Sequence, residues 1–502
     1  MKFYITASDL FNFAKCPHRP FMDRHGDPTL KVEIHPLVKL LRESGVQYET
    51  KVIESLKEQH PDKKFIDIGL EQPLSEALFL QTQQAMRDGA DYIYQGVVIS
   101  GNFAGRPDLL VKTDGKSDFG NYHYVPMDIK LARVEGTWDD GKEKVNKDHL
   151  WQILFYGDIL EKVQGVRPKG GYIYKTKTRK LYVNLQNAND QYQNALQTII
   201  SYQSKESVDS TPALNADCKM CEWQPVCKIR IKEINDCTQV YWVGVAMQKG
   251  LHKIGIKTPE DLAAQDPEQL KAQVRDLKSQ GYFWKGMPEN LIDKSIQRAK
   301  IFKSGKHVIH NKIDFPKHQF EIHYDLEDDP TQDFVYLHGL VLGEVGKEPV
   351  YHPLFAESMD EEKVITEQLF DFFKKYAGAP VYHYSPYEKT AMKRLISKYS
   401  SLDPSVFDLL FGENGTAIDL FKVINNDTDW PLSSYSIKDI CRYLGFQWDA
   451  SDASGAASIV WMNDYMNGQK DLKPKMLRYN QDDCMATYFL KHAIEKMQSK
   501  VE

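Results

Sequence analysis

The stretch CKMCEWQPVC, residues 218–227, contains three of the seven cysteines in the chain: Cys218, Cys221 and Cys227. Thiols spaced so closely are typical of a metal or cluster site. A tetrahedral zinc site and a cubane iron–sulfur cluster both need four protein ligands. A fourth ligand must therefore come from another part of the sequence, and the fold has to bring that part to residues 218–227.

The chain has 502 residues, which is too long for one hydrophobic core, so about two to four domains are expected. Apolar residues make up 42% and charged residues 27% of the sequence, as in soluble globular proteins. The N-terminal segment MKFYITASDLFNF lacks the apolar core of a signal peptide, and no stretch is long and apolar enough to span a membrane. So few cysteines do not indicate a secreted disulfide framework, and we expect a cytoplasmic protein with free thiols.

The net charge is −6, from 64 basic and 70 acidic residues. This balance argues against a protein coated in positive charge. It remains compatible with nucleic-acid binding, because a local basic groove can surround acidic metal sites in a protein that is acidic overall.

The hydrophobic pattern changes along the chain. Residues 1–60 show helical spacing, residues 92–132 alternate like adjacent strands of one sheet, and helical spacing returns from residue 148. Residues 170–185 are expected to form a hairpin with a basic turn, and residues 240–310 are expected to be helical. From about residue 315 a new strand opens an α/β region that ends in a long helix.

Acidic residues and a lysine occur on two neighbouring strands within residues 92–132. Asp108 follows a turn and precedes an apolar strand, while Asp128 and Lys130 lie two residues apart on the next strand and share a face. Pairing of these strands would bring the three side chains together. Two carboxylates and a lysine suit a Mg²⁺- or Mn²⁺-dependent phosphodiesterase, in which the carboxylates hold the metal and the lysine steadies the attacking hydroxide or the phosphorane charge. Charged residues on an exposed strand face are the alternative interpretation.

Further features accompany this pattern on predicted helices upstream and downstream. Their order resembles the motifs of the PD-(D/E)XK nuclease superfamily, specifically its RecB-like branch: Gly45 and Glu49, Gly105 and Asp108, Asp128 and Lys130, Gln152 and Tyr156. The resemblance implies a restriction-endonuclease-like core in which Glu49, Asp108 and Asp128 hold the metal, with Lys130, Gln152 and Tyr156 also catalytic. Tyr48 stands where many relatives carry a metal-binding histidine, which makes Glu49 the substitute candidate for the first ligand.

In the iron–sulfur members of this branch, one cysteine lies near the N-terminus and three follow the nuclease core. The segment ITASDLFNFAKCPHRPF supplies Cys16 in the Ser-x-Leu…Cys-Pro setting typical of those members. The resemblance therefore implies a 4Fe–4S cluster that clasps both ends of the nuclease domain, with the ligands Cys16, Cys218, Cys221 and Cys227. A structural zinc site is the alternative. The other three cysteines have no such spacing and are expected to be ordinary buried residues: Cys237, Cys441 and Cys484.

The C-terminal part of the chain carries a second acidic pattern. FEIHYDLEDD alternates so that Asp325 and Glu327 share a face at the end of a strand, and RYNQDDCMAT places Tyr479 and Asp483 on one helical face. These motifs resemble the RNase H-like, DEDD-type 3′–5′ exonucleases, in the subgroup that uses a tyrosine. The resemblance implies four carboxylates that hold two divalent ions, while the tyrosine orients the attacking water.

The remaining carboxylate of that pattern should follow a strand between these two motifs. VYHYSPYEKTAMKRL is the best match, with Glu388 opening a helix in place of an aspartate. The longer side chain leaves the activity of this site open. Asp419 in AIDLF is an alternative ligand, although it more simply ends a strand. The expected metal ligands are thus Asp325, Glu327, Glu388 and Asp483, and solvated acidic strand ends are the alternative interpretation.

Between the two patterns, LHKIGIKTPEDLA resembles one helix-hairpin-helix element, whose glycine turn lets backbone amides approach a phosphate. A plain helical spacer is the alternative. We therefore expect an α/β protein in three parts: a RecB-like nuclease domain with a 4Fe–4S cluster over residues 1–232, a helical linker over residues 233–314, and an RNase H-like 3′–5′ exonuclease-type domain over residues 315–502.

This layout implies a metal-dependent DNA nuclease that acts on single strands or ends in repair, recombination or defence, with Mg²⁺ or Mn²⁺ as cofactor. Relatives sometimes accompany or are fused to superfamily 1 helicases, so such a helicase is an expected partner, and no membrane is. The alternative is a nucleic-acid-binding scaffold in which one or both sites have decayed. Asp108, Asp128 and Lys130 favour the enzyme, whereas Tyr48 and Glu388 favour the scaffold.

Overall fold

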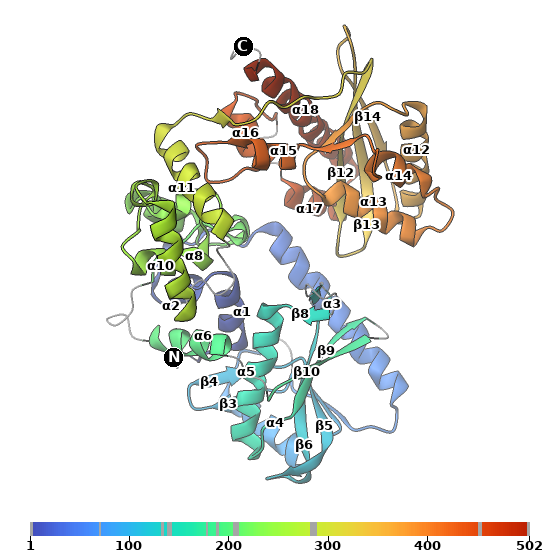
Figure 1. Ribbon diagram of the computed structural model, residues 1–502. Coiled ribbons are helices and arrows are strands. Elements are labelled where there is room, and N and C mark those ends of the chain that lie inside the picture. The colour runs from blue at the N-terminus through green and yellow to red at the C-terminus, as the bar shows by residue number, and fades with distance from the viewer. Residues whose placement is uncertain are drawn as a thin grey trace. The chain divides into compact units, whose positions relative to one another are not determined.

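The computed structural model describes residues 4–69, 72–131, 135–137, 143–176, 179–186, 190–203, 210–281, 289–449 and 454–498. The chain divides into two compact units, Met1–Cys227 and Lys228–Glu502. Both units combine helices with a sheet (Figure 1), so the predicted α/β class is confirmed.

A six-stranded mixed sheet in the order β1-β2-β5-β6-β9-β10 forms the centre of the first unit. Parallel pairing joins β1 to β2 and β6 to β9, and the other neighbours are antiparallel. Of the adjacent strands expected in one sheet within residues 92–132, β2, β5 and β6 pair in this sheet as predicted, but β3 (Val98–Ser100) and β4 (Phe103–Gly105) form a separate two-stranded sheet. The bounds are β1 Phe65–Asp67, β2 Tyr92–Tyr94, β5 Leu109–Ser117, β6 Gly120–Ile129, β9 Gly170–Thr176 and β10 Arg179–Asn184. The predicted hairpin is β9–β10, and residues 177–178 of its turn lie outside the described residues.

Helices α5 (Lys147–Gln164) and α3 (Pro36–Gln59) cover opposite faces of this sheet (Figure 1). Leu109, Met127 and Ile129 pack with α3, whereas the neighbouring Leu110 packs in the core that contains α5. Because side chains alternate along a strand, Asp128 points away from α3, to the face that α5 covers. The remaining elements of the unit are α1 Ala7–Lys15, α2 Arg19–His25, α4 Glu76–Arg87, β3 Val98–Ser100, β4 Phe103–Gly105, β7 Glu135–Thr137, β8 Glu143–Val145, α6 Asp190–Ser201 and α7 Gln224–Glu233, which runs across the division between the units.

Short helices with a core of their own form the first part of the second unit: α8 Val245–Lys253, α9 Pro259–Ala263, α10 Pro267–Ser279 and α11 Glu289–Ser304. Thr258 caps α9 through a reciprocal capping box with Asp261, and Pro259 takes the first helical position, as predicted from the sequence. Leu251, Leu262 and Ile296 are among the fully buried residues that hold these helices together.

The rest of the second unit is built on a five-stranded sheet in the order β14-β13-β12-β15-β16, antiparallel across its first three strands and parallel across its last three. One face packs on α12, α13 and α14, and a second core involves α15, α16 and α18. The bounds are β12 Phe320–Asp329, β13 Phe334–Glu344, β14 Val350–Phe355, α12 Glu362–Lys375, β15 Val381–His383, α13 Tyr387–Lys398, α14 Ser405–Phe411, β16 Ala417–Asp419, α15 Leu420–Asp427, α16 Ile437–Tyr443, α17 Gly455–Met466 and α18 Lys473–Gln498.

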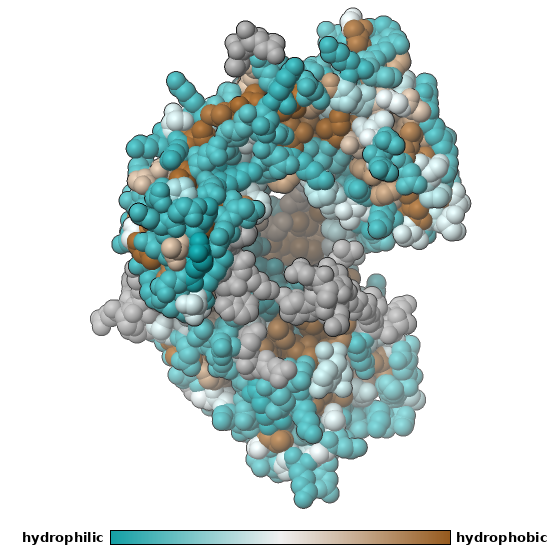
Figure 2. Space-filling view, in the orientation of Figure 1, coloured by the Kyte–Doolittle hydropathy of each residue, from teal (hydrophilic) through white to brown (hydrophobic). Residues whose placement is uncertain are grey.

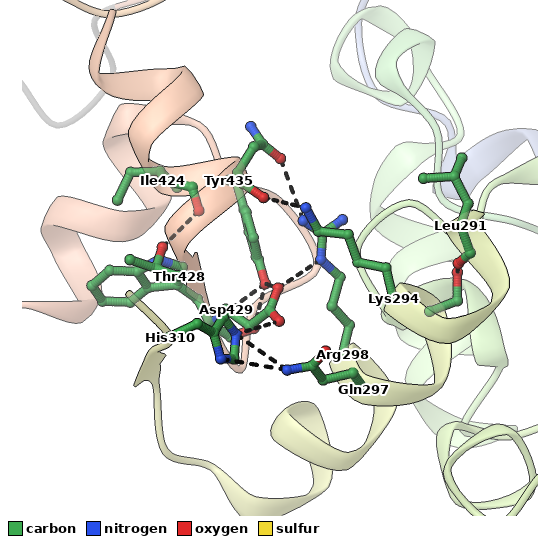
Figure 3. Close-up of polar contacts among 12 residues, drawn as sticks. Leu291, Lys294, Gln297, Arg298, His310, Ile424, Thr428, Asp429 and Tyr435 are labelled. Atoms are coloured by element: carbon green, nitrogen blue, oxygen red, sulfur yellow. Dashed lines mark hydrogen bonds and ion pairs between the residues drawn. The ribbon is translucent and has the colours of Figure 1, made fainter. Parts of the chain in front are cut away.

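The short helices are joined to this sheet region by a buried ion pair, shown in Figure 3. Arg298 on α11 donates through Nε to Asp429 Oδ1 at 2.8 Å, and both side chains are 2% exposed. His310 Nε2 lies 2.9 Å from the other carboxylate oxygen of Asp429. The strand pair β11 (Val308–Ile309) and β17 (Thr428–Asp429) runs alongside. The helical segment is therefore packed as part of the second unit.

Candidate active sites

The first site lies where β5 begins and β6 ends. Leu109 pairs with Met127, so Asp108 comes opposite Asp128 on the neighbouring strand. Lys130 Nζ lies 3.1 Å from Asp128 Oδ2 and 3.8 Å from Asp108 Oδ2. The backbone N–H of Ile129 donates to Asp108 Oδ2 at 2.6 Å, which fixes that carboxylate against the end of β6. Strand alternation thus brings together the three side chains that the sequence singled out.

Glu49 adds a third carboxylate from α3. It is buried and accepts hydrogen bonds from the side chains of Gln95 and Tyr94. Burial raises the pKa of Glu49, and the negative charge of Asp128 adds to this rise. Gln95 adopts a positive φ of 55°, which is uncommon for a residue with a side chain and occurs more often at functional sites.

The first site contains more carboxylates than cations: Glu49, Asp108 and Asp128 lie near one lysine, Lys130. Burial raises the pKa of Asp108 well above its usual range; Lys130 opposes the rise, and Asp128 and Glu49 add to it. Burial also opposes the charged form of Lys130, but Asp128 and Asp108 outweigh burial and raise its pKa. Asp128 is 1% exposed, and within the described residues its polar contact is the ion pair with Lys130, whose Nζ lies 3.1 Å from Oδ2. An oxygen donor set of this kind fits Mg²⁺ or Mn²⁺.

Tyr156 on α5 interacts with these carboxylates through their charges, whereas the hydrogen bond of Gln152 is to His149. Burial and the charges of Asp128, Asp108 and Glu49 raise the pKa of Tyr156, whose hydroxyl donates to the backbone oxygen of Arg106 at 3.3 Å. A Cβ atom at Gly105 would lie 2.8 Å from the Tyr156 ring, which explains the glycine at this position.

Gln152 hydrogen-bonds the side chain of His149 one turn earlier. Burial lowers the pKa of His149, which also interacts with the charges of Lys130 and Asp128, and its buried Nδ1 atom has no hydrogen-bond partner among the described residues. The sequence interpretation did not single out His149, although its spacing of three residues before Gln152 on one helix was visible. Tyr48 packs at the edge of the aromatic and aliphatic cluster between α3 and the sheet.

The four cysteines predicted to act as ligands line one cavity of about 30 Å³ together with Met22 and Trp223. Burial raises the pKa of Cys16 to about 11 and that of Cys227 to about 12. Within the described part of the chain, no three of the cysteine sulfurs lie within 4.8 Å of one another.

Direct contacts also tie the N-terminal helices to this region. Trp223 Nε1 donates to Asp23 at 2.8 Å, and Arg19 pairs with Glu222 at 3.1 Å. The two ends of the first unit therefore meet at the four cysteines. The other three cysteines are buried, as expected: Cys237, Cys441 and Cys484.

The second site lies on β12 and α18. Carboxylate oxygens of Asp325, Glu327 and Asp483 lie within 4.8 Å of one another. Glu388, at the start of α13, is buried; its charge raises the pKa of Asp325, and His383 Nδ1 lies 3.3 Å from its Oε2. The structure thus brings three of the four predicted ligands into one tight group, with Glu388 beside it.

Neutral donors and small residues hold these carboxylates in place. Asn480 donates to Asp325 Oδ2 at 2.8 Å, and Trp448 Nε1 donates to Asp483 Oδ1 at 2.6 Å. Ser458 hydrogen-bonds Glu327. A Cβ atom at Gly339 would lie 1.7 Å from the Asn480 side-chain oxygen, so only glycine fits there. Asn480, Trp448 and Ser458 were not predicted from the sequence.

Electrostatics in the second site resemble those in the first. Burial raises the pKa of Asp325 and of Glu327 well above the usual range, and the charge of Asp483 adds to both rises. Tyr479 hydrogen-bonds Asp483, and Lys438 Nζ donates to the hydroxyl oxygen of Tyr479 at 3.1 Å. Closely spaced, desolvated carboxylates of this kind fit divalent ions, which would neutralise their repulsion.

Asp419 has a structural role. Its Oδ1 accepts the backbone N–H groups of Phe421 and Ser385, each at 3.0 Å, and it caps α15 at the end of β16. The interpretation that it ends a strand is confirmed.

A third acidic group, Asp236 with Cys237 and His252, also has ligand atoms within 4.8 Å of one another. Asp236 already accepts hydrogen bonds from Thr238 and Gln248 and pairs with His252, so its oxygens are occupied.

The turn between α8 and α9 has the predicted hairpin form, with Gly255 at a φ of +86°. The backbone amides of this turn nevertheless already donate hydrogen bonds within the protein. Gly255 and Ile256 donate to backbone oxygens of α8, and Lys257 and Thr258 both donate to Asp261 Oδ2 at 2.9 Å. A phosphate would have to displace the Asp261 carboxylate to reach them.

Comparison with known families matches a part of each unit. Residues 5–228 match the PD-(D/E)XK nuclease superfamily, and residues 322–495 match the RNase H superfamily. The protein therefore carries a PD-(D/E)XK nuclease superfamily domain followed by an RNase H superfamily domain. Domains of both kinds are typically nucleases that hydrolyse nucleic acids. A search of curated proteins found no match.

The described helices include none that is long and apolar enough to cross a bilayer. The face of the molecule in Figure 2 is mainly hydrophilic, with apolar residues gathered in separate patches.

Proposed function

We propose that the protein is a Mg²⁺- or Mn²⁺-dependent nuclease that hydrolyses phosphodiester bonds in DNA, on single strands or at ends. The observation that carries the proposal is the first site, where the buried carboxylates of Glu49 and Asp128 and the half-buried Asp108 lie beside Lys130, which is the ion-pair partner of Asp128 within the described residues. Such a group is costly to keep in a fold unless a cation completes it.

At the first site, Glu49, Asp108 and Asp128 would hold the metal. A divalent ion bound there polarises the phosphodiester and makes water a stronger acid. Lys130 would stabilise the negative charge that develops as water adds to phosphorus and the ester oxygen leaves, because its ammonium lies beside Asp128 and Asp108. The Tyr156 ring packs against Gly105 and is close enough to these carboxylates for their charges to raise its pKa.

At the second site, we propose a 3′–5′ exonuclease centre held by Asp325, Glu327, Asp483 and Glu388. Tyr479 stands next to Asp483, where its hydroxyl can orient the attacking water. The placement of Glu388 beside the tight group, rather than in it, is the feature that would make one ion more weakly bound.

The proposal is tested with end-labelled single-stranded and duplex DNA and matching RNA, incubated with Mn²⁺, Mg²⁺ or EDTA. Metal-dependent cleavage of DNA is expected from the parent protein. Asp128→Ala should leave only shortening from 3′ ends, Asp325→Ala should leave only the first activity, and the double variant should be inert. A parent protein that binds DNA but never cleaves it would contradict the nuclease proposal and support the scaffold.

The scaffold is the second candidate function, favoured by Tyr48 and by the position of Glu388. In that case the protein would position DNA for a partner, for which the sequence resemblance implies a superfamily 1 helicase. For either function we propose a cytoplasmic protein.

We further propose that Cys16, Cys218, Cys221 and Cys227 bind a structural 4Fe–4S cluster. Their meeting around one cavity supports a shared ligand. The choice of the cluster over a structural zinc site rests on the sequence resemblance, which places one cysteine near the N-terminus and three after the nuclease core.

Purified without oxygen, the protein should be brown and contain about four irons per chain. Cys16→Ala should lose the colour and the iron and lower the thermal stability of the first unit, because one of the four ligands is removed at the clasp. Cys441→Ala, which changes a buried cysteine of the second unit, should keep the colour and the iron. Iron analysis and visible absorption measure the outcome; a colourless parent with one tightly bound zinc would overturn the cluster.

A further inference from the structure

Lys438 is a half-buried cation on α16 that faces the second carboxylate group. Its Nζ atom lies 3.1 Å from the Tyr479 hydroxyl oxygen and 4.4 Å from the centre of the Tyr479 ring. It also lies 6.0 Å from the centre of the Trp448 ring, and Trp448 donates to Asp483. The lysine is therefore held between the two aromatic residues that flank one predicted metal ligand.

The charge of Lys438 acts on the whole carboxylate group. It opposes the effect of burial on the pKa of Asp325, Glu327 and Asp483. A cation in this position repels a divalent ion bound to the same carboxylates and so lowers the affinity for that ion. A role in turnover would explain why the site contains a residue that weakens metal binding.

The hydrogen bonds of Tyr479 show what that role is. The hydroxyl group has one hydrogen to donate and two lone pairs with which to accept. It hydrogen-bonds the Asp483 carboxylate, which can only accept, and it accepts from Lys438. One lone pair is left, and its direction is fixed because the other two positions are occupied.

We propose that Lys438 is a positioning residue for the second site: it fixes the Tyr479 hydroxyl so that the free lone pair accepts a hydrogen bond from the attacking water. The proposal rests on the proposed exonuclease function of this site. In addition, its ammonium group offsets the negative charge that gathers as water adds to phosphorus. The first site also combines carboxylates with one lysine, Lys130, which follows strand β6, whereas Lys438 lies on helix α16.

The test uses the full-length Asp128→Ala protein, in which the first site is silent. Lys438→Met should lower kcat on a single-stranded 3′ end about 10²-fold, with KM for DNA changed little. The same variant should bind Mn²⁺ several-fold more tightly in calorimetry, because the repulsion between the ammonium and the ion is gone. Lys438→Arg keeps the charge and a donor, so it should restore the parent Mn²⁺ affinity and part of kcat.

Lys470→Met is the matched control, since Lys470 also lies over a tyrosine, 3.7 Å from the centre of the Tyr465 ring, and should leave both measurements unchanged. Unchanged kcat and Mn²⁺ affinity in Lys438→Met would overturn the proposal. A joint loss of kcat, Mn²⁺ binding and thermal stability would overturn it as well, because that pattern belongs to a structural lysine. Adding Asp325→Ala to the Asp128→Ala protein should remove Mn²⁺ binding. If it removes none, the proposed metal site of the second domain is wrong, and with it the exonuclease function on which this proposal rests.

Discussion

Replacing Lys130 by alanine is expected to reduce turnover at the first site about 10²- to 10³-fold while DNA affinity changes little. The lysine is paired with Asp128 and Asp108 in the resting site, so it is held by protein carboxylates and not by solvent. Its interaction with the reacting phosphate is strongest when negative charge develops on it, which affects kcat more than binding.

The measurement needs a background in which the second site is silent, so the variant is made in Asp325→Ala protein. Lys112→Ala is the matched control, because Lys112 is also a strand lysine paired with an aspartate, 3.4 Å from Asp91. It should keep full activity. If Lys130→Ala weakens DNA binding by the same factor as turnover, Lys130 is a phosphate contact and the proposed catalytic role is wrong.

The same variant tests the metal. Without Lys130, the group of Glu49, Asp108 and Asp128, of which Glu49 and Asp128 are buried, has lost its paired cation, so the metal-free protein should become less stable. Mn²⁺ should restore the loss, because the ion supplies positive charge to the same oxygens. Thermal unfolding with EDTA and with Mn²⁺ compares the two states.

Local periodicity explains why the centre of each site was predictable. The two-residue period of a strand places Asp128 with Lys130 and Asp325 with Glu327, whatever the rest of the fold does. The four-residue spacing of a helix does the same for Tyr479 and Asp483. These pairs needed no knowledge of tertiary structure beyond the strand and helix assignments.

The residues that support the carboxylates could not be found in this way. Gln95 reaches Glu49 across 46 positions of the chain, and Trp448 reaches Asp483 across 35. Lys438 lies on a short helix whose sequence gives no sign that it faces acidic groups. A lysine, a tryptophan or a glutamine has so many ordinary uses that only its position in the folded protein identifies it.

The helical segment shows the same limit on a larger scale. Its sequence predicts helices, and the helices are there, but Arg298 on α11 looks like an ordinary exposed arginine until its partner Asp429 is known. The partner lies 131 residues further along the chain. A boundary near residue 315, drawn from the change in pattern, therefore separates two residues that are buried together.

Arg298→Ala is expected to destabilise the second unit by about 3–5 kcal/mol, the cost of leaving one member of a buried ion pair unpaired. Arg298 and Asp429 are each 2% exposed, so water does not replace the lost partner. The guanidinium also lies 4.8 Å from the Tyr241 ring centre and 5.0 Å from that of Tyr435, and these contacts would be lost too. Denaturant unfolding of the full-length protein measures the change.

Arg275→Ala is the control, because Arg275 pairs with Glu289 on the surface, where both side chains are more than half exposed. It should have little effect. Replacing both partners, as Arg298→Met with Asp429→Leu, should cost less than Arg298→Ala alone, since no unpaired charge then stays buried. A double variant that is as unstable as the single one would show that the tyrosine contacts, and not the charges, hold the segment.

The outcome decides how the second site can be studied alone. Asp429 lies 3.5 Å from the Tyr435 hydroxyl, and the backbone oxygen of Tyr435 accepts a hydrogen bond from Tyr384, four residues before Glu388. A fragment that begins at residue 315 lacks Arg298 and leaves Asp429 buried without it. A fragment of residues 228–502 keeps the pair, so it should fold and bind Mn²⁺ where the shorter fragment is unstable. Equal Mn²⁺ binding by both fragments would show that the ion pair does not reach the metal site.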